Sequence, residues 1–202
     1  MRFVSPSMNP RPVILEGTHA RLEPLTAAHA AALHEAGADP EIWRHLPRGP
    51  FRDVDDAKGW IAEAMAAAAQ GREVPFAIIS REWGQVAGST RYLDIRPSDR
   101  GLEIGWTWIG APWQRTAVNT ECKYLLLRHA FEDLGVVRVQ LKTDARNLRS
   151  QTAIERIGAR REGTLRKHMA VRDGFIRDSV YFSVTDDDWP GVKARLEALL
   201  AR

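Results

Sequence analysis

The sequence predicts a mixed α/β (α+β) domain in which helices flank a twisted, mostly antiparallel sheet of six to seven strands. Two observations predict this class. Helical spacing of apolar residues dominates residues 26–70, whereas from residue 74 apolar and polar residues alternate over several short segments. A long helix with an apolar stripe then separates the strands before residue 110 from those after residue 136, which predicts a crossover connection.

The first elements are a strand and two helices. Residues 20–25 fit a strand, and Thr26 is a typical N-cap for a helix that ends near Gly37. Residues 41–51 are too rich in Pro and Gly for regular structure. A second helix is expected over residues 54–70, with Gly71 closing it.

Three antiparallel strands and the long helix form the middle of the chain. The pattern changes at residue 74 and predicts strands at 74–80, 85–95 and 102–109, of which the last alternates apolar and polar residues. The apolar stripe predicts a helix over 116–134, and Gly135 stops it. Residues 137–143 alternate again, and a strand that follows such a helix can lie parallel to the strand before it.

The C-terminal part adds a short helix, a hairpin and a last helix. Asn147 is a good N-cap for a helix that ends at Gly158. Strands at 159–172 and 175–185 flank Asp173-Gly174, a typical hairpin turn. Pro190 favours a terminal helix. Because no repeat or linker divides the chain, we expect a flexible tail over residues 1–12 and a single domain over 13–202.

Composition excludes several classes of protein. A chain of 202 residues with 44% hydrophobic and 27% charged residues is typical of a globular domain. The formal charge is +3, and no basic stripe is interleaved with aromatics, so we expect no nucleic-acid partner. One cysteine and six histidines without ligand spacing predict neither a disulfide nor a metal site. No apolar stretch approaches the roughly 20 residues that span a bilayer, which favours a cytoplasmic protein without a membrane partner; a homodimer stays an open alternative.

The strongest functional signal is the turn before the long helix, Trp113-Gln-Arg-Thr-Ala-Val-Asn119. The first N–H groups of a helix have no intrahelical partner, and the helix dipole is positive there, so such a turn is an anion site. Arg115 adds a positive charge. An ordinary helix start capped by Thr116 is the alternative interpretation.

The segments around this turn resemble the GNAT acetyltransferase superfamily. The resemblance is carried by the order strand, Gln-x-x-Ala-x-Asn, helix, strand, and then by Asn147-x-x-Ser150. Over residues 13–190 the chain also resembles the branch that contains the Rim-type ribosomal-protein N-terminal acetyltransferases. That branch shows five motifs present here: Leu22-Glu-Pro-Leu, Trp-x-x-Leu-Pro at 43–47, Glu-Ile-Gly-Trp at 103–106, Glu-Arg-Ile-Gly at 155–158 and Arg-Asp-Ser-Val-Tyr-Phe-Ser at 177–183.

The resemblance implies an acetyl-CoA-dependent N-acetyltransferase that acts on a primary amine, of a protein N-terminus or a small molecule, in a ternary complex. It implies a sheet split centrally at the cofactor site. In the family the turn wraps the pyrophosphate of coenzyme A, and Ala117 and Asn119 depart from its glycine pattern, with side chains that narrow the approach of a phosphate. The cofactor-binding residues implied are Trp108, Ile109, Gln114, Arg115, Thr116, Ala117, Val118, Asn119, Thr120 and Asn147. Trp108 and Ile109 would act through their backbone, which is compatible with packing in the core, and Asn147 is equally well explained as a cap.

Acetyl transfer needs a neutral amine and a proton for the departing thiolate. Glu103, on the strand before the turn, is the candidate base, acting directly or through water; a surface carboxylate is the alternative. Many relatives protonate the thiolate with a Tyr, but the matching position here is Ile154. The Rim-type branch uses a Ser at the position of Ser150, and the alternative for Ser150 is a helix-start serine that bonds the backbone.

The acceptor side is less defined by the sequence. Trp43, His45 and Leu46 lie in the irregular region that forms the acceptor wall in relatives, although Trp and Leu also fit a small core. Cys122 lies on the apolar stripe and is expected to be packed. The changed turn and the missing Tyr leave a second class open, a non-catalytic acyl-CoA-binding or regulatory module on the same fold. Protein N-termini, polyamines, amino acids and antibiotic amines all remain candidate acceptors.

Overall fold

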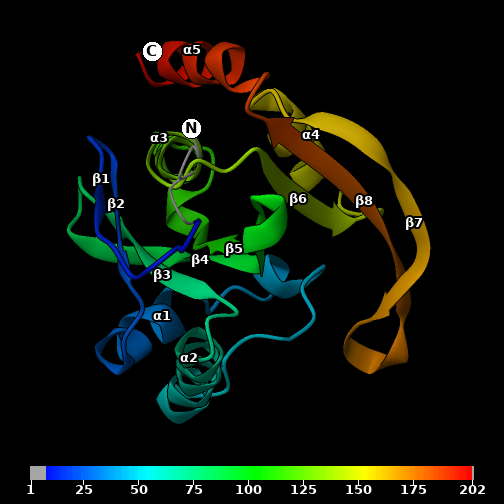
Figure 1. Ribbon diagram of the computed structural model, residues 1–202. Coiled ribbons are helices and arrows are strands. Elements are labelled where there is room, and N and C mark those ends of the chain that lie inside the picture. Colours follow the sequence, from blue (N-terminus) through cyan, green and yellow to red (C-terminus); the bar gives the residue numbers. More distant parts are fainter. Residues whose placement is uncertain (1–7, 202) are drawn as a thin grey trace.

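The computed structural model describes residues 8–201, and the strands in this range form one mixed sheet with α-helices around it (Figure 1). The strand order is β1-β2-β3-β4-β5-β6-β8-β7, and every neighbouring pair is antiparallel except β5 and β6. This confirms the predicted fold class, although the described residues form eight strands where six to seven were expected, because the two-residue β1 was not predicted. The strands are β1 (Leu15–Glu16), β2 (Ala20–Pro24), β3 (Val74–Ser80), β4 (Gln85–Arg96), β5 (Gly101–Ile109), β6 (Arg138–Asp144), β7 (Arg160–Ala170) and β8 (Ile176–Thr185).

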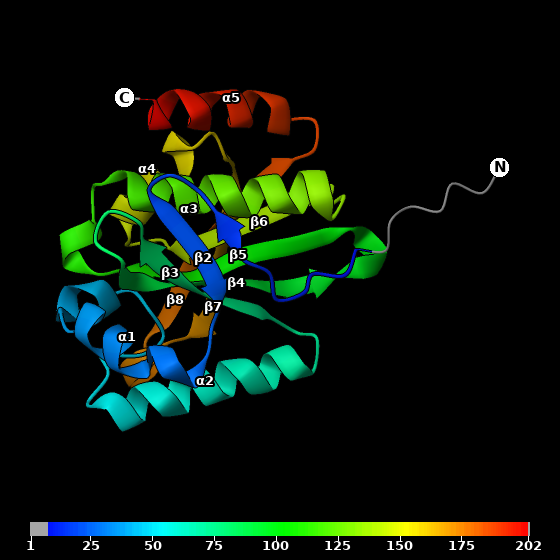
Figure 2. The ribbon, with the colours of Figure 1, turned by 90° about the vertical axis from the view of Figure 1, so that its left-hand side faces the viewer.

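The helices cover both faces of this sheet. Figures 1 and 2 show α1 and α2 on one face and α3 on the other, with α5 stacked over α3. The helices are α1 (Ala30–Ala36), α2 (Val54–Ala69), α3 (Ala117–Arg128), α4 (Leu148–Arg156) and α5 (Trp189–Leu200). None of the helices in residues 8–201 has the length and hydropathy needed to cross a bilayer.

Local sequence explains most element ends. The side chain of Asp53 accepts a hydrogen bond from the backbone N–H of Asp56 at 2.8 Å and caps α2. In the turn between β7 and β8, Asp173 and Gly174 both have positive φ, 63° and 72°, as the hairpin prediction requires. The helix expected over 116–134 is α-helical to Arg128 and then widens into a π-helical turn at His129–Asp133.

Aromatic side chains fill the core between the sheet and α1 and α2. Trp43 is fully buried, and its ring centroid lies 5.0 Å from those of Phe51 and Trp108. Met8, at the start of the described range, is also buried in the hydrophobic core of the protein. The predicted flexible tail therefore does not include Met8, and residues 1–7 lie outside the described range.

The sheet opens at its centre. The parallel pairing of β5 with β6 covers only residues 101–103 against 138–140, and beyond Glu103 the strands diverge. β5 also carries an irregularity, because its register with β4 shifts between Ser89 and Arg91 and Trp106 adopts a φ of 50°. The bulge turns β5 away from β6 and leaves an opening between them.

Candidate active site

A cavity of about 730 Å³ occupies the opening between β5 and β6, a size typical of small-molecule sites. Its walls come from β5 and β6, the first two turns of α3, the length of α4, and Ile42, His45, Leu46 and Pro47. Met169 and Arg177, from the β7–β8 hairpin, complete it.

Glu103 lies at the point of divergence and is only 2% exposed. Its Oε2 accepts hydrogen bonds from Gln140 Nε2 at 2.8 Å and Lys142 Nζ at 2.9 Å, both from β6. Its Oε1 accepts no hydrogen bond from the residues in the described range. Glu103 lines the cavity, so this is a buried carboxylate with one oxygen still available, not a surface one.

The predicted anion turn lies at one end of the cavity. Arg115 has a φ of 62°, and Thr116 caps α3 by accepting a hydrogen bond from the N–H of Val118 at 3.3 Å. Gln114 joins the two walls, because its Nε2 donates to Ile109 O at 2.9 Å and its Oε1 accepts from Arg149 Nη1 at 2.9 Å. Gln114 thus holds the end of β5 against the start of α4.

Two α3 side chains one turn apart face the cavity. Asn119 has a buried Oδ1 that is left without a hydrogen-bond partner in residues 8–201. Lys123 is buried, and its Nζ donates to Thr107 Oγ1 at 2.7 Å. Burial lowers the pKa of Lys123 below its ordinary value. An orphaned acceptor beside a desolvated cation is a polar environment that a bound molecule can complete.

The start of α4 forms the wall next to α3. Asn147 caps this helix by accepting a hydrogen bond from the N–H of Ser150 at 3.0 Å, and both residues line the cavity. Ile154 lies one turn further on and also lines it, as an apolar surface. The cap orients the first turn of α4, so Ser150 is held at the cavity wall.

Most of the residues predicted from the sequence meet in this cavity, and four do not line it. Trp43 is buried in the aromatic core, where its Nε1 donates to Gly37 O at 2.8 Å. The structure therefore does not bring Trp43 to the cavity, whereas the neighbouring residues Ile42, His45, Leu46 and Pro47 line it. Ala117, Val118 and Thr120 are also absent from the lining, and Thr120 Oγ1 accepts a hydrogen bond from Arg156 Nη2 at 2.6 Å.

His45 is held in the cavity wall with a buried Nδ1 that finds no hydrogen-bond partner among the described residues. Burial lowers the pKa of His45 below its ordinary value of 6.5, and this effect outweighs the opposing influence of the Asp144 carboxylate. His45 therefore presents a neutral imidazole to the cavity at neutral pH.

Comparisons with known proteins identify the family of this chain. The family model described as "Acetyltransferase (GNAT) domain" matches residues 19–160. The chain belongs to the GNAT acetyltransferase family. A GCN5-related N-acetyltransferase from Brucella melitensis superposes with a TM-score of 0.91 at 31% identity, covering 99% of this chain and 90% of that one. A protein from T. thermophilus, provisionally described as an acetyltransferase, is 43% identical with a TM-score of 0.86 over 95% and 98% of the two chains.

The fold is also that of RimJ from Mycobacterium smegmatis, solved in complex with CoA-disulfide. That structure has a TM-score of 0.80 at 21% identity, covering 93% of this chain and 95% of that one. The chain is thus a GNAT-family N-acetyltransferase, and the cavity is its candidate active site.

This acetyltransferase cavity is strongly basic, a property that sequence reasoning missed. Among the described residues that line it, Glu103 is the single carboxylate. Six Lys and Arg side chains face it from four elements and the turn before α3, so no local charge run in the sequence revealed them. They are Arg115, Lys123, Lys142, Arg149, Arg156 and Arg177.

Proposed function

We propose that this GNAT enzyme transfers the acetyl group of acetyl-CoA to a primary amine by direct attack within a ternary complex. In this reaction the amine nitrogen bonds to the acetyl carbon, the carbon–sulfur bond breaks, one proton leaves the nitrogen and one proton ends on the thiol. The observation that carries the proposal is Glu103: a buried carboxylate with one free oxygen, in the cavity that opens beside the start of α3.

The residues present fit coenzyme A. It carries several phosphate charges, and Arg115, Arg149 and Arg156 line the α3–α4 end of the cavity, where the first N–H groups of α3 are free of intrahelical partners. Diverging strands leave backbone amide groups of β5 and β6 available to the amides of the pantetheine arm. The buried Oδ1 of Asn119 has no hydrogen-bond donor in the described residues. Asn119 stands where the family turn has Gly or Ala, so this chain offers a hydrogen-bond acceptor where relatives leave space for a phosphate.

Glu103 accepts the proton from the amine, directly or through one water, at Oε1. Lys142 and Gln140 both bind Oε2, so they hold the carboxylate in one rotamer and keep the other oxygen turned to the cavity. Ser150 lines the opposite wall and supplies the proton for the departing thiolate, because Ile154 offers no such group. The acceptor enters past His45 and Leu46.

Calorimetric titration with acetyl-CoA, followed by assay of free thiol with a panel of amines, tests the proposal. We expect saturable binding and turnover on at least one amine. Glu103→Gln should lower kcat most at low pH, where the amine is most protonated, and Ser150→Ala should slow thiol release. Glu63→Gln, which changes an exposed carboxylate on α2, is the matched control and should change neither.

Two outcomes would count against these assignments. An unchanged pH–rate profile in Glu103→Gln removes Glu103 from proton transfer, and full activity in Ser150→Ala removes Ser150. Tight binding of acetyl-CoA without turnover on any amine would instead favour the acyl-CoA-binding module.

A further inference from the structure

Arg177 on β8 is a buried cation at the cavity for which the proposed mechanism has no use. It is 6% exposed and lines the cavity beside Met169, its cross-strand partner on β7. Its Nε donates to Ser179 Oγ at 3.0 Å. Within residues 8–201, no carboxylate forms an ion pair with its guanidinium, although buried cations in proteins are usually paired.

Asp144 and Glu103 are the two carboxylates whose charges act most on Arg177, and each forms an ion pair with another cation. Asp144 accepts hydrogen bonds from the Arg146 guanidinium at 3.0 and 2.7 Å. Glu103 accepts one from Lys142 at 2.9 Å. Burial lowers the pKa of Arg177, and it outweighs the opposing influence of these two carboxylates. The molecule thus keeps a desolvated positive charge at the cavity without a counter-charge of its own.

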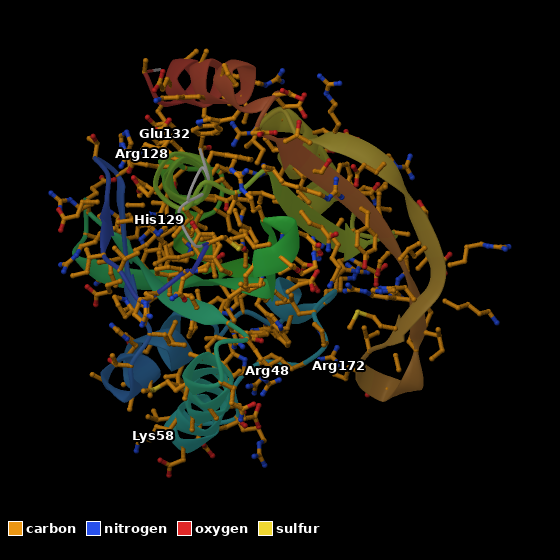
Figure 3. All side chains as sticks on the ribbon, viewed as in Figure 1. Arg48, Lys58, Arg128, His129, Glu132 and Arg172 are labelled. Carbon is orange, nitrogen blue, oxygen red and sulfur yellow. The ribbon has the colours of Figure 1, made fainter. Side chains whose placement is uncertain are left out.

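This cation lies on the hairpin wall of the cavity, not on the α3–α4 wall. Arg177 is two residues before Ser179, which pairs with Asp144 at the end of β6. From there the β7–β8 hairpin curves toward the face that carries α1 and α2, opposite α3 (Figure 1). At its tip, Arg172 packs on the loop before α2, where a Cβ at Gly49 would lie 2.7 Å from Arg172 Nη1; Figure 3 shows Arg172 beside Arg48 there. Arg177 therefore lies on the side of the cavity that is away from the proposed phosphate site.

We propose that Arg177 binds a carboxylate of the acceptor, so that the substrate is an amine that carries a carboxylate in the same molecule. This rests on the proposed function, in which the amine lies at Glu103. A guanidinium is suited to this role because its planar fork binds a carboxylate through two parallel hydrogen bonds. A polyamine acceptor would instead bring positive charge to a wall that already holds an unpaired cation.

The test compares acids with their uncharged analogues. Glycine, β-alanine and γ-aminobutyrate vary the distance between amine and carboxylate, and glycinamide, β-alaninamide and γ-aminobutyramide remove the charge. Peptide amides that begin with Asp or Asn test a carboxylate on a protein N-terminus. At the preferred distance between amine and carboxylate, we expect kcat/KM for the acid to exceed that for its amide by roughly 10- to 100-fold, the range of one charge-assisted contact. A preference for the acid among the amino acids indicates a small-molecule acceptor, and a preference for Asp over Asn among the peptides indicates a protein N-terminus.

Arg177→Gln should abolish this preference through a higher KM for the acid, with little change in kcat, in KM for the amide or in acetyl-CoA affinity. Arg177→Lys should retain part of it. Arg166→Gln, which removes an exposed charge from the neighbouring strand β7, is the matched control and should keep the full preference. Equal loss of activity on acid and amide in Arg177→Gln would mean a purely structural role and would overturn the proposal, as would wild-type enzyme that is indifferent to the carboxylate.

A binding measurement separates this proposal from the proposed function. N-acetylglycine and N-acetyl-γ-aminobutyrate, and their amides, are titrated into the wild-type protein and Arg177→Gln. If no amine is acetylated, the proposed function fails, but tighter binding of the acid than the amide in the wild type alone still supports the carboxylate site. Equal binding of acid and amide in both proteins refutes it.

Discussion

Glu121 offers a sharp test of how the helix at the active site is held. Its side chain is buried, and Oε1 accepts a hydrogen bond from Thr18 N at 2.9 Å while Oε2 accepts one from Ala20 N at 2.6 Å and another from His19 N. The carboxylate of α3 thus caps three consecutive N–H groups in the turn between β1 and β2. Glu121→Ala removes all three acceptors at once.

The expected cost follows from the burial of each donor. Ala20 is fully buried, so its N–H stays unsatisfied at about 1–3 kcal/mol, whereas Thr18 is exposed and His19 partly exposed, and both can recruit water at a smaller cost. We expect Glu121→Ala to lower the free energy of unfolding by about 3–5 kcal/mol. For a chain of this size that corresponds to a fall in Tm of roughly 10 °C.

Urea denaturation and thermal unfolding measure this loss, with Glu63→Ala on the exposed face of α2 as the control. Gly17 supplies a second perturbation, because a Cβ at this residue would overlap the Glu121 carboxylate. Gly17→Ala should therefore destabilise the protein too, and in a double-mutant cycle with Glu121→Ala the two effects should be far from additive. A loss below about 1 kcal/mol in Glu121→Ala, or simple additivity, would refute the reasoning.

Three further predictions concern groups with shifted pKa values. Lys123→Met should raise the stability of the ligand-free protein by about 1–4 kcal/mol, because it removes a buried cation that has no carboxylate partner among the described residues. Folding lowers the pKa of Lys123, so this gain in stability over the wild type should shrink as pH rises toward the unfolded pKa of about 10.4. A gain that does not depend on pH argues against this cause. Burial raises the pKa of the Cys122 thiol to about 11. The native protein should therefore not react with a thiol reagent at mildly alkaline pH, whereas the protein in denaturant should react at once. Rapid labelling of Cys122 in the native protein contradicts this prediction. The folded protein lowers the pKa of His45 below 6.5, so the contribution of His45 to stability is present above that pH and is lost as pH falls below it. His45→Gln should therefore flatten the acid side of a plot of unfolding free energy against pH, measured by urea denaturation. An unchanged slope excludes His45 as the cause.

Local patterns in the sequence predicted most of the fold. Alternation located the strand at Arg138–Asp144, and Asp173-Gly174 located the last hairpin, because each signal depends on neighbours along the chain. β1 escaped prediction since Leu15–Glu16 is too short to show alternation. The π-helical turn at His129–Asp133 was not predicted either.

The site was only partly predictable, for a related reason. The resemblance to the GNAT superfamily pointed to Glu103, Ser150 and the turn before α3, whose catalytic and binding roles stay predictions. The burial of Glu103 depends on Lys142, which lies 39 residues away in sequence on β6. Whether residue 43 or 45 faces the cavity depends on how a short loop packs, which no periodicity encodes. Arg177 comes to the cavity through β8, after two crossovers of the chain.

The short ladder between β5 and β6 has a consequence for the order of the empty protein. Only three residue pairs join these two strands, so the half of the sheet from β1 to β5 is tied to the half formed by β6, β8 and β7 through very few backbone bonds. We expect a molecule that binds in the gap to pair with the free edges of β5 and β6 and so close the sheet. Amide protons at the edges of the gap, near residues 104–109 and 141–144, should then exchange with solvent quickly in the free enzyme and slowly in the loaded one. In the proposed complex, the pantetheine arm of acetyl-CoA would supply the hydrogen bonds that a neighbouring strand would otherwise make.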